Sequence, residues 1–88
     1  MPSLIRDGRT MKLSRHARNS IRLYKIELQD LSLTISSPEE TATEGNRQVA
    51  FKVHPNKFSG YPLKVVYEQV GEDITIVTAY PLKKKHWR

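Results

Sequence analysis

The chain has 88 residues, enough for one small domain, and its 38% hydrophobic and 27% charged residues are typical of a globular protein. It has no cysteine, which excludes disulfides, thiolate metal sites and thiol catalysis, and no apolar run approaches the roughly 20 residues of a membrane span. The N-terminal residues also lack the apolar stretch of a secretion signal, so the sequence predicts a soluble cytoplasmic protein.

The N-terminal segment, residues 1–10, has no clear periodicity and predicts a flexible extension or a short edge strand. A helical pattern begins just after it, so the predicted domain spans residues 11–88. Met11 stands at this boundary and is a second candidate start site.

The clearest helical pattern predicts a first helix over residues 14–24. Ser14 is a good N-cap, because its hydroxyl can accept a hydrogen bond from an amide of the first turn. Apolar side chains then recur at helical spacing at Ala17, Ile21 and Tyr24, which we expect to form the buried stripe.

A second, shorter helix is predicted after it, beginning at Ile26 or Leu28. Leu31 and Ile35 supply its apolar side, and Ser37 before Pro38 ends it, because the residue before a proline disfavours helical geometry. The two helices therefore stand together at the start of the domain.

Four strands are predicted in the rest of the chain, where the hydrophobic period changes to two. Residues 40–44 and 47–54 form one hairpin, and residues 62–70 and 73–81 form a second with the turn "GED". The predicted class is α+β, with the two helices on one face of an antiparallel sheet of three or four strands. We expect the hairpin of residues 62–80 at the centre of the sheet.

The net charge of +6 predicts a negatively charged partner. The cations form two clusters, in residues 6–25 and 83–88, and most acids lie between them. The alternative is that both clusters are solvated surface, although an indole within the second favours packing or base stacking. The candidate nucleic-acid-binding residues are Arg15, Arg18, Lys83, Lys84, Lys85 and Trp87.

Motifs for metal or nucleotide binding are absent from the sequence, and so is the G-x-S-x-G motif of serine hydrolases. We therefore predict no metal and no cofactor. His, Arg, Lys, Thr and Tyr remain, and this set suits RNA cleavage that uses the 2′-hydroxyl as nucleophile. That reaction needs a base, an acid and cations for the charge that develops on phosphorus.

Four residues are the candidates for this chemistry. His16 would be base or acid, Arg22 a cation, and Thr78 and Tyr80 share a face of the last strand by its period of two. Each also has a structural explanation, as a surface histidine, a solvated arginine, a β-branched strand residue and an aromatic that closes the sheet. His54, beside a proline in a loop, is the reserve histidine.

The segments "LSRHARNSIRLYKI" and "VTAYPLKKKHW" resemble a small uncharacterised domain family of bacteria and archaea. Its members have a His-Ala first helix and a Thr-Ala-Tyr-Pro last strand. The family is similar to the RelE/ParE and BrnT-like ribonuclease toxins. The resemblance covers about residues 11–87 and implies a RelE-like fold. By motif position, the resemblance implies functional roles for His16, Arg22, Thr78 and Tyr80.

The leading functional prediction is a metal-independent endoribonuclease of the toxin type, with RNA and an antitoxin protein as the expected partners. The same basic residues would also serve a non-catalytic RNA- or DNA-binding module, which is the first alternative. The second alternative is a toxin-like scaffold that binds another protein through an edge strand.

Overall fold

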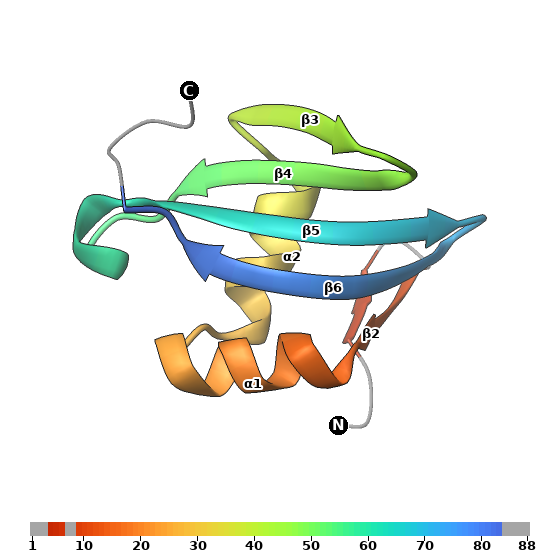
Figure 1. Ribbon diagram of the computed structural model, residues 1–88, viewed down its shortest axis with the longest axis horizontal. Coiled ribbons are helices and arrows are strands. Elements are labelled where there is room, and N and C mark those ends of the chain that lie inside the picture. The colour runs from red at the N-terminus through yellow and green to blue at the C-terminus, as the bar shows by residue number, and fades with distance from the viewer. Residues whose placement is uncertain (1–3, 7–8, 84–88) are drawn as a thin grey trace.

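The computed structural model describes the backbone of residues 4–6 and 9–83 and the side chains of residues 11–83. Two helices and six strands form the domain (Figure 1). Its α+β class agrees with the prediction from the sequence. None of the helices in this part of the chain is long and apolar enough to cross a membrane. The elements are β1 (Leu4–Arg6), β2 (Arg9–Leu13), α1 (Arg15–Tyr24), α2 (Leu28–Ser36), β3 (Glu40–Glu44), β4 (Arg47–Val53), a 3-10 turn (Phe58–Gly60), β5 (Pro62–Val70) and β6 (Asp73–Pro81).

The sheet has the order β1-β2-β6-β5-β4-β3, so the β5–β6 hairpin lies at its centre as predicted. The expected sheet of three or four antiparallel strands is corrected, because β1 and β2 extend it and β2 pairs with β6 in parallel. The predicted boundary at residue 11 therefore falls inside β2. Five residues of alternating polarity were too short a pattern to identify this strand, and its partner lies more than 60 residues further along the chain.

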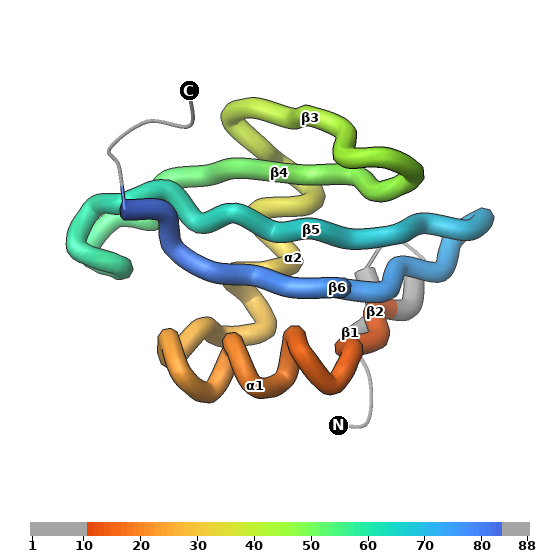
Figure 2. Tube along the Cα trace, in the orientation of Figure 1, coloured from red at the N-terminus to blue at the C-terminus, as the bar shows by residue number. Residues whose placement is uncertain are grey.

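Helix α1 follows directly from β2 and runs alongside β6 (Figure 2). The predicted cap is confirmed: the Ser14 hydroxyl accepts a hydrogen bond from the Ala17 amide at 3.0 Å. The same hydroxyl donates to the Val77 carbonyl oxygen at 2.7 Å and ties the helix start to β6. The helix ends where Lys25 adopts the left-handed conformation, with φ of 56°.

The main core lies between the helices and one face of the sheet. Leu63 and Val65 of β5 and Ile76 of β6 are fully buried there against Leu31 of α2 and Ala17 of α1. Strand residues alternate between the faces, and a bulge interrupts the register between Val66 and Tyr67. A smaller cluster lies on the face opposite the helices and consists of Val49, Phe51 and Val66, with Val77 and Leu82 packed against it.

Candidate functional site

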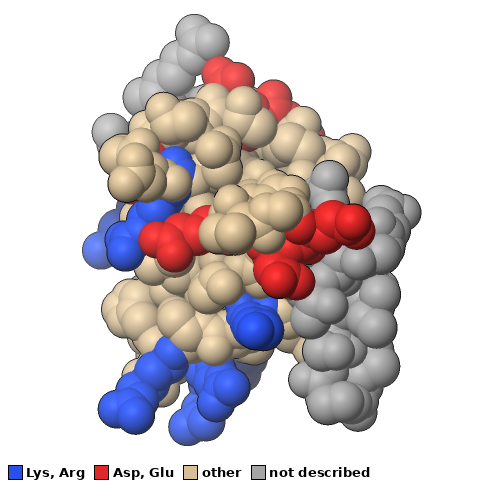
Figure 3. All heavy atoms as spheres, turned by 90° about the vertical axis from the view of Figure 1, so that its right-hand side faces the viewer, with Lys and Arg blue, Asp and Glu red and all other residues tan. Residues whose placement is uncertain are grey.

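Four cations lie along one side of α1 and form what we call the basic stripe: Arg15, Arg18, Arg22 and Lys25. Their spacing of three and four residues places the three arginines on one helix face, Lys25 follows at the C-cap, and all four residues are exposed. The ion pairs found among residues 11–83 include none of them. Lys and Arg side chains accordingly gather at the lower end of the molecule in Figure 3, which is where α1 lies in Figure 1.

The four candidate catalytic residues are divided between two regions. His16 and Arg22 are exposed on α1, whose buried residues pack on the helix-covered face of the sheet. Tyr80 pairs with Lys64 and Thr78 with Val66, so both belong to the opposite face. These pairings place Thr78 and Tyr80 on the face of the sheet opposite to the one on which α1 packs, while the start of α1 contacts β6 through the Ser14–Val77 hydrogen bond.

Thr78 and Tyr80 have different environments on that face. The Thr78 hydroxyl oxygen is buried and makes no hydrogen bond within the described part of the chain. Lys64 Nζ lies 5.6 Å from the centroid of the Tyr80 ring, and it donates to Glu44 Oε2 at 3.0 Å. A local ion pair and a ring contact thus account for Tyr80 and Lys64 without a ligand.

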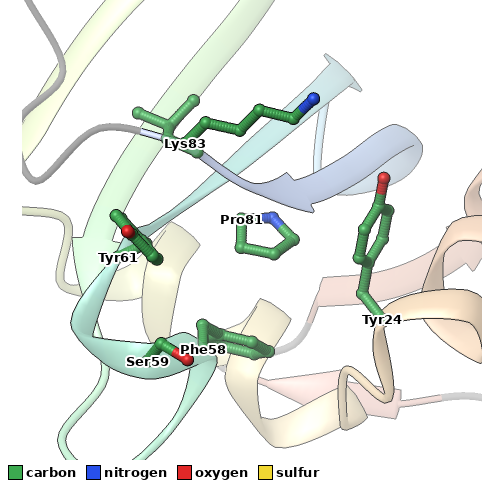
Figure 4. A pocket seen from close by; sticks show the side chains of 7 residues that line it. Tyr24, Phe58, Ser59, Tyr61, Pro81 and Lys83 are labelled. Atoms are coloured by element: carbon green, nitrogen blue, oxygen red, sulfur yellow. The ribbon is translucent and has the colours of Figure 1, made fainter.

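A pocket of about 360 Å³ lies at the C-terminal end of α1, and we call it the aromatic pocket. In Figure 4, the rings of Tyr24, Phe58 and Tyr61 surround Pro81, and Lys83 borders the pocket above it. Tyr24 was expected in the buried stripe of α1, but its side chain is 42% exposed. The full lining is Tyr24, Phe58, Ser59, Tyr61, Pro81, Leu82 and Lys83.

A second hollow of about 650 Å³ meets the aromatic pocket at Tyr24, Phe58 and Ser59. It continues past Lys25, the last residue of the basic stripe, to Lys57 and its ion-pair partner Glu27. The end of α1 is thus the place where cations and open aromatic surface meet. Aromatic rings beside cations suit a ligand that has both flat rings and negative charge, and nucleic acid is such a ligand.

The loop that lines the aromatic pocket has an unusual backbone. Three non-glycine residues in it adopt left-handed conformations: Asn56 with φ of 63°, Phe58 with φ of 56° and Ser59 with φ of 55°. Each such residue costs roughly 1–2 kcal/mol, and asparagine less than the others, so the surrounding structure must hold them in place. Strain of this kind concentrates at functional sites.

Buried polar groups beneath the loop provide that support. Asp30, Thr34 and His54 are 2%, 0% and 4% exposed. The Thr34 hydroxyl lies 2.8 Å from His54 Nε2 and donates to the Asp30 carbonyl oxygen at 2.7 Å. Lys57 Nζ donates to both carboxylate oxygens of Asp30 at 3.0 Å and also contacts Glu27. We call Asp30, Thr34, His54 and Lys57 the anchor network.

Asp30, Thr34 and His54 of the anchor network are buried, whereas Lys57 is partly exposed and lines the second hollow, so the network supports the loop from beneath. Burial lowers the pKa of His54, with Lys52 and Lys57 acting in the same direction, and the nearby Asp30 carboxylate opposes the shift only in part. Hydrogen bonds with Lys57 lower the pKa of Glu27, and the same contacts raise the pKa of Lys57. His54, the reserve catalytic histidine, is therefore buried in surroundings that disfavour its protonated form.

Several residues of this region were not predicted from the sequence. Tyr24 stood in an apolar stripe, and Phe58 and Tyr61 stood in a segment recognisable only as a loop. The one available signal was the presence of two aromatic residues in a loop rich in turn-forming residues. Of the predicted binding residues, Arg15 and Arg18 lie in the basic stripe and Lys83 borders the pocket. Lys84, Lys85 and Trp87 lie outside the described residues.

Within residues 11–83, no group of three or more His, Asp or Glu side chains is placed to hold a metal ion. Comparison of the chain with protein-family models, with curated proteins and with solved structures gave no match. The resemblance to ribonuclease toxins therefore stays a prediction.

Proposed function

We propose that the protein binds RNA and that the basic stripe of α1 contacts the sugar-phosphate backbone. The observation that carries this proposal is the set of three exposed arginines on one helix face, followed by an exposed lysine at the C-cap, without an acidic partner in the described part of the chain. Over ten residues the stripe extends about 15 Å along the helix, which is enough for several consecutive phosphates.

The basic stripe destabilises the helix that carries it, which favours a role in ligand binding over simple solvation. The first turn of α1 contains no acid, and Arg15 stands there at the positive end of the helix dipole. Arg18 and Arg22 are four residues apart and repel each other. A bound polyanion would relieve both unfavourable interactions, whereas ordinary solubility would be served as well by mixed charges.

Binding is preferred to cleavage because cleavage needs proton donors, proton acceptors and cations within a few ångström of one phosphate. Thr78 and Tyr80 belong to the face of the sheet opposite to the one on which α1 packs, and this supports binding over cleavage. The endoribonuclease, the antitoxin partner and the protein-binding scaffold remain predictions from the sequence.

The decisive experiment measures the affinity for a fluorescent 12-nucleotide single-stranded RNA by anisotropy, between 50 and 200 mM salt. The double variant Arg18→Gln/Arg22→Gln should bind about tenfold more weakly at 100 mM salt. The slope of log affinity against log salt should become shallower by about 1.4, because two phosphate contacts are lost.

The matched control is Arg47→Gln, which removes one cation at the far side of the sheet, where Arg47 pairs with Glu68. This variant should bind like the wild type. If it and the double variant lose affinity equally, the basic stripe is only a solvated face. The same RNA, incubated with protein and a chelator, tests cleavage: products with 2′,3′-cyclic phosphate ends would restore the ribonuclease hypothesis.

A further inference from the structure

We infer that the aromatic pocket accepts one unstacked base of the bound strand, so that the protein selects single-stranded RNA over duplex RNA. This inference rests on the proposed function and names the form of RNA that the site takes. Its basis is the position, the lining and the preorganisation of the pocket.

The aromatic pocket lies next to the basic stripe. Tyr24 lies in α1 between Arg22 and Lys25, so the ring that opens the pocket is flanked by two cations of the basic stripe. Lys83 borders the pocket from the end of β6. A strand whose phosphates follow the stripe therefore brings its next base to the Tyr24 ring. Lys83 adds a cation near the following phosphate.

The lining suits a base rather than a peptide or a metal ion. Tyr24, Phe58 and Tyr61 offer aromatic surface, and Pro81 and Leu82 add apolar surface between them. Its volume of about 360 Å³ lies at the small end of ligand pockets, which fits one flat ring and part of its sugar. Stacking on such rings is tolerant of sequence, because every base has two flat faces.

Preorganisation favours binding, because a rigid pocket loses little conformational entropy when a ligand enters. The Phe58 ring makes an edge-to-face contact with His54, with ring centroids 6.0 Å apart and planes at 89°. His54 is itself held by Thr34. The anchor network thus fixes the ring of Phe58 while Tyr24 stays partly exposed beside it.

A base in duplex RNA cannot use this pocket, because it is stacked between its neighbours and paired on its edge. The free energy needed to unstack and unpair the base is not offset by the contacts that one pocket of this size provides. The duplex can still contact the basic stripe through its phosphates. The pocket therefore distinguishes single-stranded from duplex RNA, whereas the stripe does not.

The test compares a 12-nucleotide single strand and a 12-base-pair duplex, both fluorescein-labelled, in anisotropy titrations at 100 mM salt. Tyr24→Ala should bind the single strand about tenfold more weakly and the duplex as tightly as the wild type does. Tyr24→Phe, which keeps the ring, should lose much less. Leu23→Ala is the matched control: it truncates the adjacent residue of the same helix, which is 71% exposed and outside the pocket.

A second measurement uses a single strand that contains 2-aminopurine, a base whose fluorescence falls when it stacks. The wild type should quench it, and Tyr24→Ala should not. The inference is overturned if Tyr24→Ala leaves the single-strand affinity unchanged or lowers both affinities equally. In that case a loss of binding in Arg18→Gln/Arg22→Gln would still support the proposed function. A wild type that binds neither RNA overturns both proposals.

Discussion

The two ends of the β5–β6 hairpin differ in which residue types adopt left-handed backbone conformations. At the closed end, the turn after Val70 places its left-handed residue at Gly71, with φ of 61°, and the residues from Glu68 to Asp73 are exposed. At the open end, the loop before β5 places Asn56, Phe58 and Ser59 in left-handed conformations.

This difference shows where the chain tolerates strain and what keeps the strain in place. Glycine adopts the left-handed conformation without steric cost, so the closed end needs no support from the core. At the open end, the left-handed positions hold residues with side chains, above all Phe58, whose ring lines the aromatic pocket. Its strained loop lies over the anchor network, whose Asp30, Thr34 and His54 side chains are buried.

The largest effect is expected from removing the acid that supports the open end. Asp30→Ala should lower the free energy of unfolding by about 3 kcal/mol, because it leaves Lys57 without its buried partner and removes the Asp30 side chain from beneath the loop. Urea denaturation monitored by circular dichroism measures the change.

Glu68→Ala provides the matched control, since it breaks the Arg47–Glu68 ion pair near the closed end, where both side chains are about half exposed. It should cost less than about 1 kcal/mol. Equal losses in the two variants would contradict the distinction between a supported and an unsupported end.

A smaller effect is expected from placing a side chain on the closed turn. Gly71→Ala should cost about 1 kcal/mol from backbone strain alone, because a Cβ atom at this position meets no other atom within 4 Å. RNA binding in anisotropy titrations should be unaffected, since the turn is remote from the aromatic pocket.

Asn56→Gly makes the reverse change at the open end, and it should alter stability by less than Gly71→Ala does. Asparagine already tolerates the left-handed region, and glycine gains entropy in the unfolded chain that offsets the relief of strain. A loss larger than that of Gly71→Ala would show that the Asn56 side chain itself holds the loop.

The smallest effect concerns the titration of His54. Its pKa is lowered in the folded protein, so below the ordinary value of about 6.5 the unfolded chain binds the proton more readily. The stability that comes from the neutral imidazole is fully present above pH 6.5 and is lost as the pH falls toward the folded pKa. The free energy of unfolding should therefore decrease from pH 7 to pH 5.

His54→Gln removes this titration and retains a group that can hydrogen-bond to Thr34, so its stability should depend less on pH over the same range. Unfolding curves of both proteins at several pH values test the difference. Parallel pH dependences would show that groups other than His54 control the acid sensitivity.

The local elements of this protein were determined by the sequence itself. Ser14 and the helical spacing after it defined α1, and the turn signals defined both hairpins, because caps, periods and turns are properties of neighbouring residues. The cluster of cations in residues 6–25, which includes the basic stripe, was also evident from the sequence.

Only the tertiary structure decided which distant segments meet. The parallel pairing of β2 with β6 and the meeting of Tyr24, Phe58 and Pro81 in one pocket have no local signature. The same is true of the burial of His54 against Thr34. The sequence suggested a site built from His16 and Tyr80, whereas the alternation of β6 and the packing of α1 direct them to different surroundings. Such contacts depend on how the helices and strands pack together, and this packing is a property of the whole chain.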